Sequence, residues 1–460
     1  MHHPDDESAR LTEAIVRYAV ARTRLDPPPL DHGLTPVELA AMAGRTITAD
    51  GIGGHEALRI FTDVLGPSCI SVDHPRFLSF IPAAPTEASI LFDLVVGASN
   101  IFGGSWLEGS GAVHAENEAL RYVSDLAGLP ATAGGVFVSG GTAGNLSALI
   151  AARWRWRQRA DGRLDRTRGL IIASTGAHSS IAAAGRAMDA DVVSVPADAE
   201  GRLHREALVE LIANTCQEDL DRVFAIVATC GTTNAGVIDH LDGVADAAER
   251  LDTWMHVDGA YGGAGLAAPS IRERYVGIER ADSFIVDPHK WMFAPFDCCA
   301  LIYRDPQLAR RAHTQHAEYL DVLHGGGEGH DDEWNPSDFA HHLSRRARGL
   351  PFWFSLATYG TLAYSEAVEQ TLRVAHEGAR RIGAAPHLEL VMEPELSVVM
   401  FRRVGWSDAE YRAWSERLLL DGIAFVTPSA WDGSPILRIC VVNPRTSIDD
   451  IDLLIASLAA

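Results

Sequence analysis

The chain has 460 residues, 47% of them hydrophobic and 22% charged, which is typical of a folded globular protein with two or three domains. Its net charge of −22 argues against nucleic acid or an anionic membrane as the main partner. It has no apolar run of about 18 residues or more, and its polar, acidic N-terminus does not resemble a signal peptide, so we expect a cytoplasmic protein. The six cysteines lack paired spacing and are expected to be reduced and mostly buried.

Residues 1–75 are expected to form a helical N-terminal segment. "LTEAIVRYAVA" has apolar residues at helical spacing, and "LTPVELAAMAG" is typical of a helix that ends at a glycine. The stretch "HPRFLSFIPAAP" follows as an extended, proline-broken segment. Its residues Phe80 and Pro82 would suit the wall of a pocket.

Residues 76–355 are expected to form a large α/β domain. From about residue 135, short apolar strands alternate with helical patterns, which predicts a mostly parallel sheet covered by helices on both faces. Ligands bind such sheets at the carboxyl ends of the strands. The predicted strands lie in "GVFVSG", "GLIIAS", "DVVSVP", "VFAIVATCG", "WMHVDGA", "SFIVDP" and "CCALIYR".

The glycine-rich, acidic stretch "HGGGEGHDDEWNPSD" interrupts this rhythm and predicts a functional mobile loop over about residues 318–342. Residues 356–460 are expected to form a small α+β domain. It would contain a long helix, strands in "LSVVMFRRV", "GIAFVTPS" and "ILRICVVNP", and the final helix "TSIDDIDLLIASLAA".

The motif "SGGTAGN" joins a predicted strand to a predicted helix. Glycines such as Gly141 allow an anion to approach the backbone, Thr142 adds a hydroxyl, and the helix N-terminus supplies free N–H groups. The motif alone fits a phosphate site and a tight turn about equally, because it is neither a Walker A loop nor GxGxxG.

Three further polar residues follow predicted strands. His178 precedes a helix, and by itself it would be interpreted as a helix cap. Asp258 ends an apolar strand, where a carboxylate is costly to bury unless it meets a cation, although a cap or turn is the simpler reading. Lys290 follows "SFIVDP", and burial together with a neighbouring cation is expected to lower its pKa, as in lysines that form Schiff bases. An isolated lysine there would simply be solvated.

Together these motifs match the requirements of pyridoxal 5'-phosphate. The glycine loop would hold the phosphate, Lys290 would form the imine, and Asp258 would pair with the ring nitrogen so that the ring acts as an electron sink. His178 would stack on one face of the ring, and the small Ala260 would leave room on the other.

Over roughly residues 70–445 the chain resembles the group II pyridoxal-phosphate decarboxylases, which include the aromatic L-amino acid, glutamate and histidine decarboxylases. "DSFIVDPHKWMFAPFDCCAL" is the most specific motif of this resemblance. The following motifs match in the same order: "HPRFLSF", "SGGTAGNLSALIAAR", "AHSSIAAAG", "ATCGTTNAG", "VDGAYGG" and "LSRRARGLPFW".

The resemblance implies fold type I of the pyridoxal-phosphate-dependent transferases, the aspartate-aminotransferase-like fold. It also implies a homodimer with active sites at the subunit interface and the N-terminal segment packed on the partner. Lys290, Asp258 and His178 would be the catalytic residues. The implied cofactor-binding residues are Gly141, Thr142, His178, Thr232, Asp258, Ala260, Asp287, His289 and Lys290, and the implied substrate-binding residues are Phe80, Pro82, Trp106, Phe339 and Arg438.

Two departures from the family pattern bear on mechanism. Asp287 stands where many members have asparagine, which could change cofactor affinity or nearby pKa values. Phe339 stands near the place of the loop tyrosine that returns a proton in the aromatic amino acid decarboxylases; Tyr319, His341 or His342 could substitute. A phenylalanine there goes with aldehyde formation in some relatives, so either an amine or an aldehyde product is compatible with the sequence.

The favoured reaction is decarboxylation of an L-amino acid to its amine and CO2. An aromatic substrate is the first choice because Phe80 and Trp106 offer an apolar wall, and a small or branched aliphatic one is the second. The alternatives are an aldehyde synthase, another lyase or an aminotransferase that uses the same cofactor, and a non-catalytic binding protein. A metal site is not expected, because these histidines lack metal-binding spacing: His313, His316, His324, His330, His341 and His342.

Overall fold

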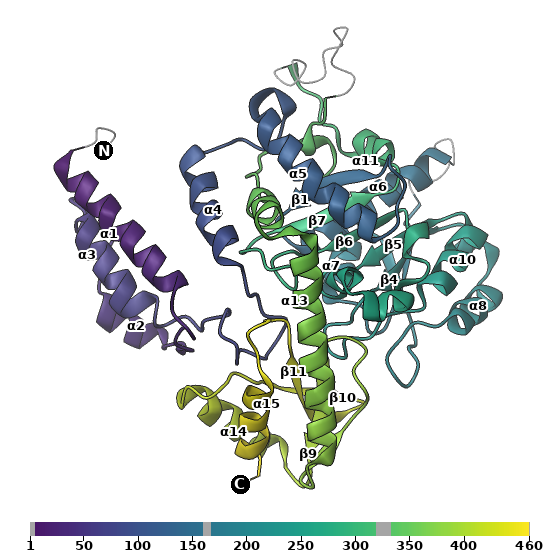
Figure 1. Cartoon of the computed structure of the whole chain (residues 1–460). Helices are drawn as coiled ribbons and strands as arrows, with labels where there is room; N and C mark the ends of the chain where they lie inside the picture. The colour runs from purple at the N-terminus through teal and green to yellow at the C-terminus, as the bar shows by residue number, and fades with distance from the viewer. Residues whose placement is uncertain (1–4, 160–166, 319–332, 460) are drawn as a thin grey trace.

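The centre of the protein is a seven-stranded sheet with helices on both faces (Figure 1). This computed structural model describes residues 5–159, 167–318 and 333–459. The spatial order is β1-β7-β6-β5-β4-β2-β3, and only β7 runs antiparallel to its neighbours, which confirms the predicted mostly parallel sheet. The strands are β1 (Gly134–Val138), β2 (Leu170–Ser174), β3 (Asp191–Val195), β4 (Val223–Thr229), β5 (Trp254–Asp258), β6 (Ser283–Val286) and β7 (Cys299–Tyr303).

The central strands β2, β4, β6 and β7 are largely apolar because both faces of the sheet are covered. In β4, Ala225 and Val227 pack on one side with residues of α6 and α7, whereas Ile226 and Ala228 pack on the other side with residues of α8 and α10. The helices of this part are α4 (Glu87–Ser99), α5 (Trp106–Leu126), α6 (Gly141–Arg159), α7 (Ser179–Ala187), α8 (Arg205–Asn214), α9 (Gln217–Leu220), α10 (Leu241–Leu251) and α11 (Pro306–His313), with the short helices η2 (Gly262–Ala267), η3 (Pro269–Tyr275), η4 (Ile278–Arg280) and η6 (Pro336–Asp338).

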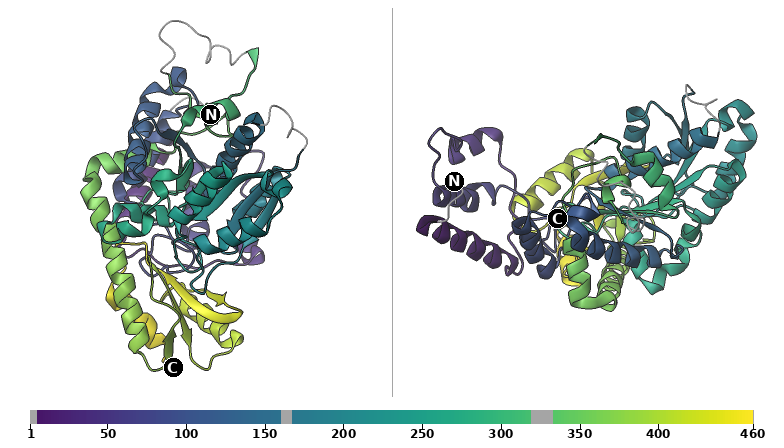
Figure 2. Two further views of the ribbon diagram at one scale, coloured as in Figure 1. Left: turned by 90° about the vertical axis from the view of Figure 1, so that its right-hand side faces the viewer. Right: turned by 90° about the horizontal axis from the view of Figure 1, so that it is seen from above.

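The long helix α13 (Leu350–Ala384) runs from the main sheet to a second, smaller sheet near the C-terminus (Figures 1 and 2). This antiparallel sheet has the order β10-β11-β9-β8. Its elements are β8 (Leu388–Leu390), β9 (Val398–Arg403), α14 (Asp408–Leu420), β10 (Pro428–Trp431), β11 (Ser434–Cys440) and α15 (Ile448–Ser457).

The N-terminal helices stand away from the rest of the chain in Figure 1 and in the right-hand view of Figure 2. They are α1 (Asp6–Thr23), α2 (Pro36–Ala43), α3 (Gly54–Ile60) and the π-helical turn η1 (Phe61–Leu65). Neither α1 nor α2 has a buried residue, although both carry apolar side chains. Across the described ranges, no helix combines the length and apolar character needed to cross a membrane.

Candidate active site

A cavity of about 570 Å³ opens where several strands of the main sheet end. It lies beyond the carboxyl ends of β1, β4, β5 and β6, as expected for a sheet of this topology. It is lined by Ser139, Gly140, Gly141, Thr142, Ala143, Asn145, Leu146, His178, Thr229, Gly231, Thr233, Asp258, Ala260, Tyr261, Asp287, His289, Lys290, Phe296, Asp297, His341 and His342. The structure therefore brings most of the predicted site residues into one cavity.

One end of the cavity is formed by the N-terminus of α6. A Cβ atom on Gly141 would lie 3.1 Å from the Cβ of Ala260 and 3.3 Å from Oδ2 of Asp287, so a side chain would crowd this end of the cavity. Free N–H groups and the positive end of the helix dipole face the same space. This end has the chemistry of an anion site.

Asp258 ends β5 and is only 5% exposed. Its Oδ2 accepts a hydrogen bond of 2.8 Å from the side-chain amide of Asn145, and its Oδ1 accepts one of 3.1 Å from the backbone N–H of Ala260. The carboxylate is therefore fixed from both sides at the wall of the cavity.

His178 caps α7, and the same contacts fix its tautomer. Its Nδ1 accepts the backbone N–H of Ser180 at 3.2 Å and lies 2.9 Å from that residue's Oγ. The other Nδ2 hydrogen of Asn145 points to this Oγ at 2.9 Å, so the hydroxyl proton is free to be donated to His178. In this arrangement His178 carries its proton on Nε2. The same side chain thus caps α7 and lines the cavity.

Asn145 is oriented in turn by His256 on β5. Nε2 of His256 lies 2.8 Å from Oδ1 of Asn145, and its Nδ1 lies 2.8 Å from Oγ of Ser283. Burial lowers the pKa of His256 to about 4, so the ring is neutral at pH 7. A neutral ring that donates from Nε2 and accepts at Nδ1 satisfies both contacts, and Trp254 donates to the same Ser283 hydroxyl at 2.8 Å.

Lys290 meets a carboxylate rather than a cation. Its Nζ lies 2.9 Å from Oδ2 of Asp287, which is 1% exposed. Burial alone would lower the pKa of Lys290, but the charge and hydrogen bond of Asp287 more than offset it, so the pKa lies above the ordinary lysine value. The expected lowering of this pKa was therefore wrong for the cofactor-free chain.

His289 is held by the backbone that follows the lysine. Its Nδ1 lies 3.0 Å from the N–H and 2.7 Å from the carbonyl oxygen of Cys298, and its ring packs on Phe296 at 4.9 Å between centroids. Burial lowers the pKa of His289, which favours a neutral ring. Its Nε2 is 3.6 Å from Oδ2 of Asp287, so His289, Asp287 and Lys290 form one cluster.

Some predicted residues do not line this cavity. Thr232 is buried and borders a neighbouring hollow with Asn234 and Trp431, while Thr229 and Thr233 line the cavity instead. Phe80 is 60% exposed and contacts Phe425.

The other predicted substrate-binding residues also lie outside the cavity wall. Pro82 is buried and Trp106 is half-buried at the start of α5. Phe339 is 2% exposed and stacks on Trp334 at 4.0 Å, and Arg438 is 6% exposed on β11. None of these four residues is among those that line the cavity within one chain.

Sequence reasoning missed Asn145, Ser180 and His256. Their signal was present: an asparagine near the start of a glycine-led helix, a serine two residues after His178, and a histidine inside a mostly apolar strand. Each is a polar residue at a position that the pattern predicts to be buried, where it needs a partner.

Part of the predicted loop, including Tyr319, His324 and His330, lies outside the described residues. Of the other loop residues, His341 and His342 line the cavity, and Oγ of Ser147 lies 2.9 Å from Nδ1 of His341. In the ranges that the structure describes, no group of three or more potential ligands could hold a metal ion.

Comparison with known proteins decides the family. A family model described as the pyridoxal-dependent decarboxylase conserved domain matches residues 55–404. The chain belongs to this family. An aromatic-L-amino-acid decarboxylase of Bacillus atrophaeus is 29% identical over 390 residues, covering 83% of this chain and 79% of that protein. An L-2,4-diaminobutyrate decarboxylase of Rhizobium meliloti (strain 1021) is 32% identical over 396 residues, covering 84% and 78%.

A solved structure of Oryza sativa TDC with PLP and tryptamine superposes with a TM-score of 0.88 at 24% identity, covering 100% of this chain and 98% of that one. The likeness confirms the fold type I architecture. The protein is thus a pyridoxal-phosphate-dependent carboxy-lyase of amino acids.

The described residues fit this cofactor. The anion site at α6 suits a phosphate, and Asp258 is held where a carboxylate can meet a ring nitrogen. Two buried oxygens at the cavity, Oγ1 of Thr229 and Oδ1 of Asp287, have no hydrogen-bond partner in the protein. Buried polar atoms of this kind indicate that the cavity is built for a polar occupant.

Proposed function

We propose that the enzyme removes the α-carboxylate of an aromatic L-amino acid and releases CO2 and the corresponding amine. The observation that carries this proposal is the convergence of Lys290, Asp258 and His178 on one cavity. When bound, the cofactor supplies an electron sink for the bond that breaks. We assign to Lys290 the attachment of the cofactor, to Asp258 the pairing with its ring nitrogen, and to His178 contact with its face.

His178 is also suited to act on the substrate. Because its Nδ1 is an acceptor for Ser180, its Nε2 proton is available as a donor. A donor at this point could orient the departing carboxylate and exclude water from the reacting carbon. The phosphate contacts are proposed for Gly141, Thr142 and His289, which line the same cavity.

The choice of an aromatic substrate rests on the cavity wall. Phe296, Tyr261 and the paired rings of His341 and His342 supply aromatic surface, with the two histidine rings 3.8 Å apart. Burial lowers the pKa of both histidines, which favours neutral rings. The described lining residues include no arginine and no lysine other than Lys290, so no further lysine or arginine is available for a side-chain carboxylate.

Arg438 is proposed to bind the α-carboxylate. It is 6% exposed, and its Nε and Nη2 have no hydrogen-bond partner among the described residues. Its charge acts on Tyr261, a residue that lines the cavity. A buried guanidinium without a carboxylate is costly, and an anionic substrate would relieve that cost.

The protein is proposed to act as a homodimer. Ile15, Val16, Val37 and Ile47 are exposed on the N-terminal segment, and Val37 and Ile47 are 79% and 85% exposed. Apolar side chains gathered on a projecting segment indicate a partner surface. A second copy would cover them and could bring Phe80, Pro82, Trp106 and Phe339 or their neighbours to a shared site.

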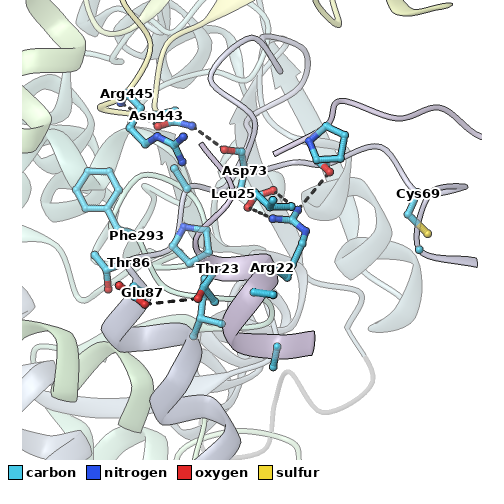
Figure 3. A pocket seen from close by; sticks show the side chains of 18 of the residues that line it. Arg22, Thr23, Leu25, Cys69, Asp73, Thr86, Glu87, Phe293, Asn443 and Arg445 are labelled. Atoms are coloured by element: carbon cyan, nitrogen blue, oxygen red, sulfur yellow. Dashed lines mark hydrogen bonds and ion pairs between the residues drawn. The ribbon is translucent and has the colours of Figure 1, made fainter. Parts of the chain in front are cut away.

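The base of this segment borders a large apolar hollow of about 1040 Å³ (Figure 3). Arg22 pairs with Asp73 at 2.9 Å, and the amide of Asn443 donates to the backbone carbonyl of Asp73 at 3.0 Å. These contacts fix the segment at its base while its apolar face stays open, as expected for a surface that a second copy covers. A cytoplasmic location stays a prediction from the sequence.

An aldehyde product is the second candidate. The only tyrosine among the described lining residues is Tyr261, whose hydroxyl lies 2.5 Å from Oγ of Ser397 and is buried. Burial raises the pKa of Tyr261 well above the ordinary value, so it is a poor proton donor to a carbon. Phe339 has no hydroxyl either. Another group must therefore supply the proton that the α-carbon receives after CO2 leaves.

The test is a screen of the twenty amino acids with the cofactor-loaded enzyme, measuring CO2, amine, aldehyde and ammonia together. The proposal predicts that kcat/KM is highest for an aromatic amino acid and that amine equals CO2. A preference for aliphatic amino acids would overturn the substrate class. Aldehyde and ammonia in place of amine would favour the second candidate.

A further inference from the structure

Lys290 is the only lysine in the sequence; the other 38 of its 39 basic residues are arginine. The chain therefore has one side-chain amine that can react with an aldehyde, since a guanidinium stays protonated in proteins. Whatever controls the charge of this amine controls its reactivity.

The backbone places Asp287 against this amine. The N–H of Asp287 donates to the carbonyl of Ala260 at 3.0 Å, and the N–H of Lys290 donates to the carbonyl of Asp287 at 2.9 Å. This turn directly follows β6 and brings Nζ to 2.9 Å from Oδ2. The other oxygen, Oδ1, is buried and has no hydrogen-bond partner in the protein.

The other titratable groups around the pair do not replace this contact. Asp258 also acts on Lys290, but its oxygens already accept hydrogen bonds from Asn145 and Ala260. Burial raises the pKa of the Cys298 and Cys299 thiols, so both are neutral at pH 7. His289 is favoured as neutral because burial lowers its pKa.

Asp297 lines the same cavity but pairs with Arg348. It faces the His289 side of the cluster, where its charge acts on that ring. Asp287 is thus the carboxylate in direct contact with the amine, and it lies beside Gly141 at the anion site.

We propose that Asp287 is a positioning residue that holds Lys290 as an ammonium ion until the cofactor arrives, which makes cofactor capture dependent on pH. The proposal rests on the function proposed above. Capture requires the neutral amine: the nitrogen bonds to the aldehyde carbon and one water leaves, so the ammonium proton must first pass to solvent. Asp287 therefore orients the amine and, by stabilising its protonated form, slows its reaction with the aldehyde.

The test uses the cofactor-free, full-length protein and its single lysine. Acetic anhydride would be added in pulses at several pH values, followed by trypsin and mass spectrometry of the peptide Ala281–Arg304. Acetylated Lys290 is not cleaved, so the intact peptide reports modification and the two fragments report the free amine. The N-terminal amine serves as an internal reference.

In the wild type, half-maximal labelling is expected above the ordinary lysine pKa of about 10.4. Asp287→Asn keeps the shape of the side chain but removes its charge, so burial then dominates and the titration moves to lower pH. A downward shift of at least about one pH unit corresponds to about tenfold faster labelling near pH 8. Cofactor capture, followed by its absorption band, is expected to accelerate by a similar factor.

Asp297→Asn is the matched control, because it removes a carboxylate of the same cavity that does not touch the amine. It is expected to leave the titration of Lys290 unchanged. An identical titration in the wild type and in Asp287→Asn would overturn the proposal. Should Asp287→Asn fail to fold, a wild-type midpoint at or below about 10.4 would overturn it equally.

The labelling result is independent of catalysis. A raised wild-type midpoint without any cofactor binding would refute the proposed function but leave the Asp287–Lys290 contact standing. Cofactor binding with a pH-independent capture rate would refute the proposed role of Asp287 and leave the proposed function intact.

Discussion

Asn145 connects the two sides of the active-site cavity through one amide group. Its Nδ2 donates to Asp258 and to Ser180, and its Oδ1 faces His256. Asn145→Ala would leave these buried groups unsatisfied and free Asp258 to move. We expect cofactor affinity to fall by about 1–3 kcal/mol, or roughly five- to 150-fold in Kd, measured by titration of the cofactor absorption band.

Asn443→Ala is the control for this change. Asn443 is also buried, 3% exposed, but its amide donates to the backbone carbonyl of Asp73, outside the cavity wall. It should lower stability without changing cofactor affinity. Equal Kd values for Asn145→Ala and the wild type would show that the amide does not hold Asp258.

His256 gives the same network a dependence on pH. Its pKa is about 4 in the folded chain and about 6.5 when exposed, so the unfolded state binds the proton more tightly. The contribution of the neutral ring is therefore complete above pH 6.5 and is lost as the pH falls toward 4. His256→Gln has no titrating group at this position.

The free energy of unfolding of the wild type, relative to that of His256→Gln, should thus fall by about 3 kcal/mol between pH 7 and pH 4. Denaturant unfolding of both proteins at several pH values measures this difference. Other titrating groups contribute equally to both proteins and cancel in the comparison, including Asp239, whose pKa burial raises to about 7 and whose effect on stability has the opposite sign. A difference that stays constant with pH would contradict the neutral, buried assignment of His256.

From the sequence we predicted the cavity residues that directly follow strands, but not the residues that hold their side chains in place by hydrogen bonds. Asp258 and Lys290 could be predicted because their motifs, taken together with the glycine loop and His178, match one cofactor, although each residue alone fits a cap, a turn or a solvated side chain. The charge of Lys290 could not, because it depends on the 2.9 Å contact with Asp287 that the turn creates. Phe80 and Phe339 were assigned by resemblance, and their roles stay predictions.

At the scale of elements, strands covered on both faces were predictable and isolated strand segments were not. Strand β4 is buried at every position and apolar from Val223 to Ala228, and its sequence indicates a buried strand without ambiguity. In contrast, "GIAFVTPS" was predicted as a strand, but β10 begins only at Pro428, because residues 423–427 connect α14 to the sheet and pair through isolated contacts such as Phe77–Phe425. The three-residue β8 gives too short a pattern to predict.

The close packing of α6 on the sheet positions the anion site. A Cβ on Gly144 would lie 2.8 Å from Cγ2 of Ile285 and 3.1 Å from Sγ of Cys299, so Gly144→Ala should push the start of α6 away from β6 and β7. We expect a loss of about 1–3 kcal/mol in the free energy of unfolding together with weaker cofactor binding.

Gly383→Ala is the control helix substitution. Its Cβ would meet only Cβ of Leu390 at 4.0 Å, so alanine should be neutral or stabilise α13 by up to about 1 kcal/mol. Thermal unfolding and cofactor titration of both variants test the comparison. A neutral Gly144→Ala would mean that α6 can shift without disturbing the site.

At the scale of the whole molecule, the projecting N-terminal segment predicts association. The proposed dimer would have twice the 49.6 kDa mass of one chain in sedimentation equilibrium. The double variant Val37→Asp/Ile47→Asp places two charges on this surface. In a monomer the charges stay in water and cost little, whereas in a dimer they would be buried at the interface. We expect it to shift the protein toward the monomer and to reduce activity with it.

Leu420→Asp changes an equally apolar side chain, 63% exposed at the end of α14 in the small domain, and should leave the mass unchanged. A wild-type protein that sediments as a monomer at micromolar concentration would refute the proposed dimer. It would also require the site to be complete within one chain.

The most direct test of the account compares wild type and Lys290→Ala, each supplied with pyridoxal phosphate, for the visible absorption band and for CO2 release from aromatic amino acids. Because Lys290 is the single lysine, no other side chain can replace it. The account predicts that the wild type shows the absorption band and releases CO2 and amine in equal amounts. It predicts that Lys290→Ala shows neither the band nor the release of CO2 and amine. A wild-type band without CO2 release from any amino acid, or undiminished CO2 release by Lys290→Ala, would contradict it.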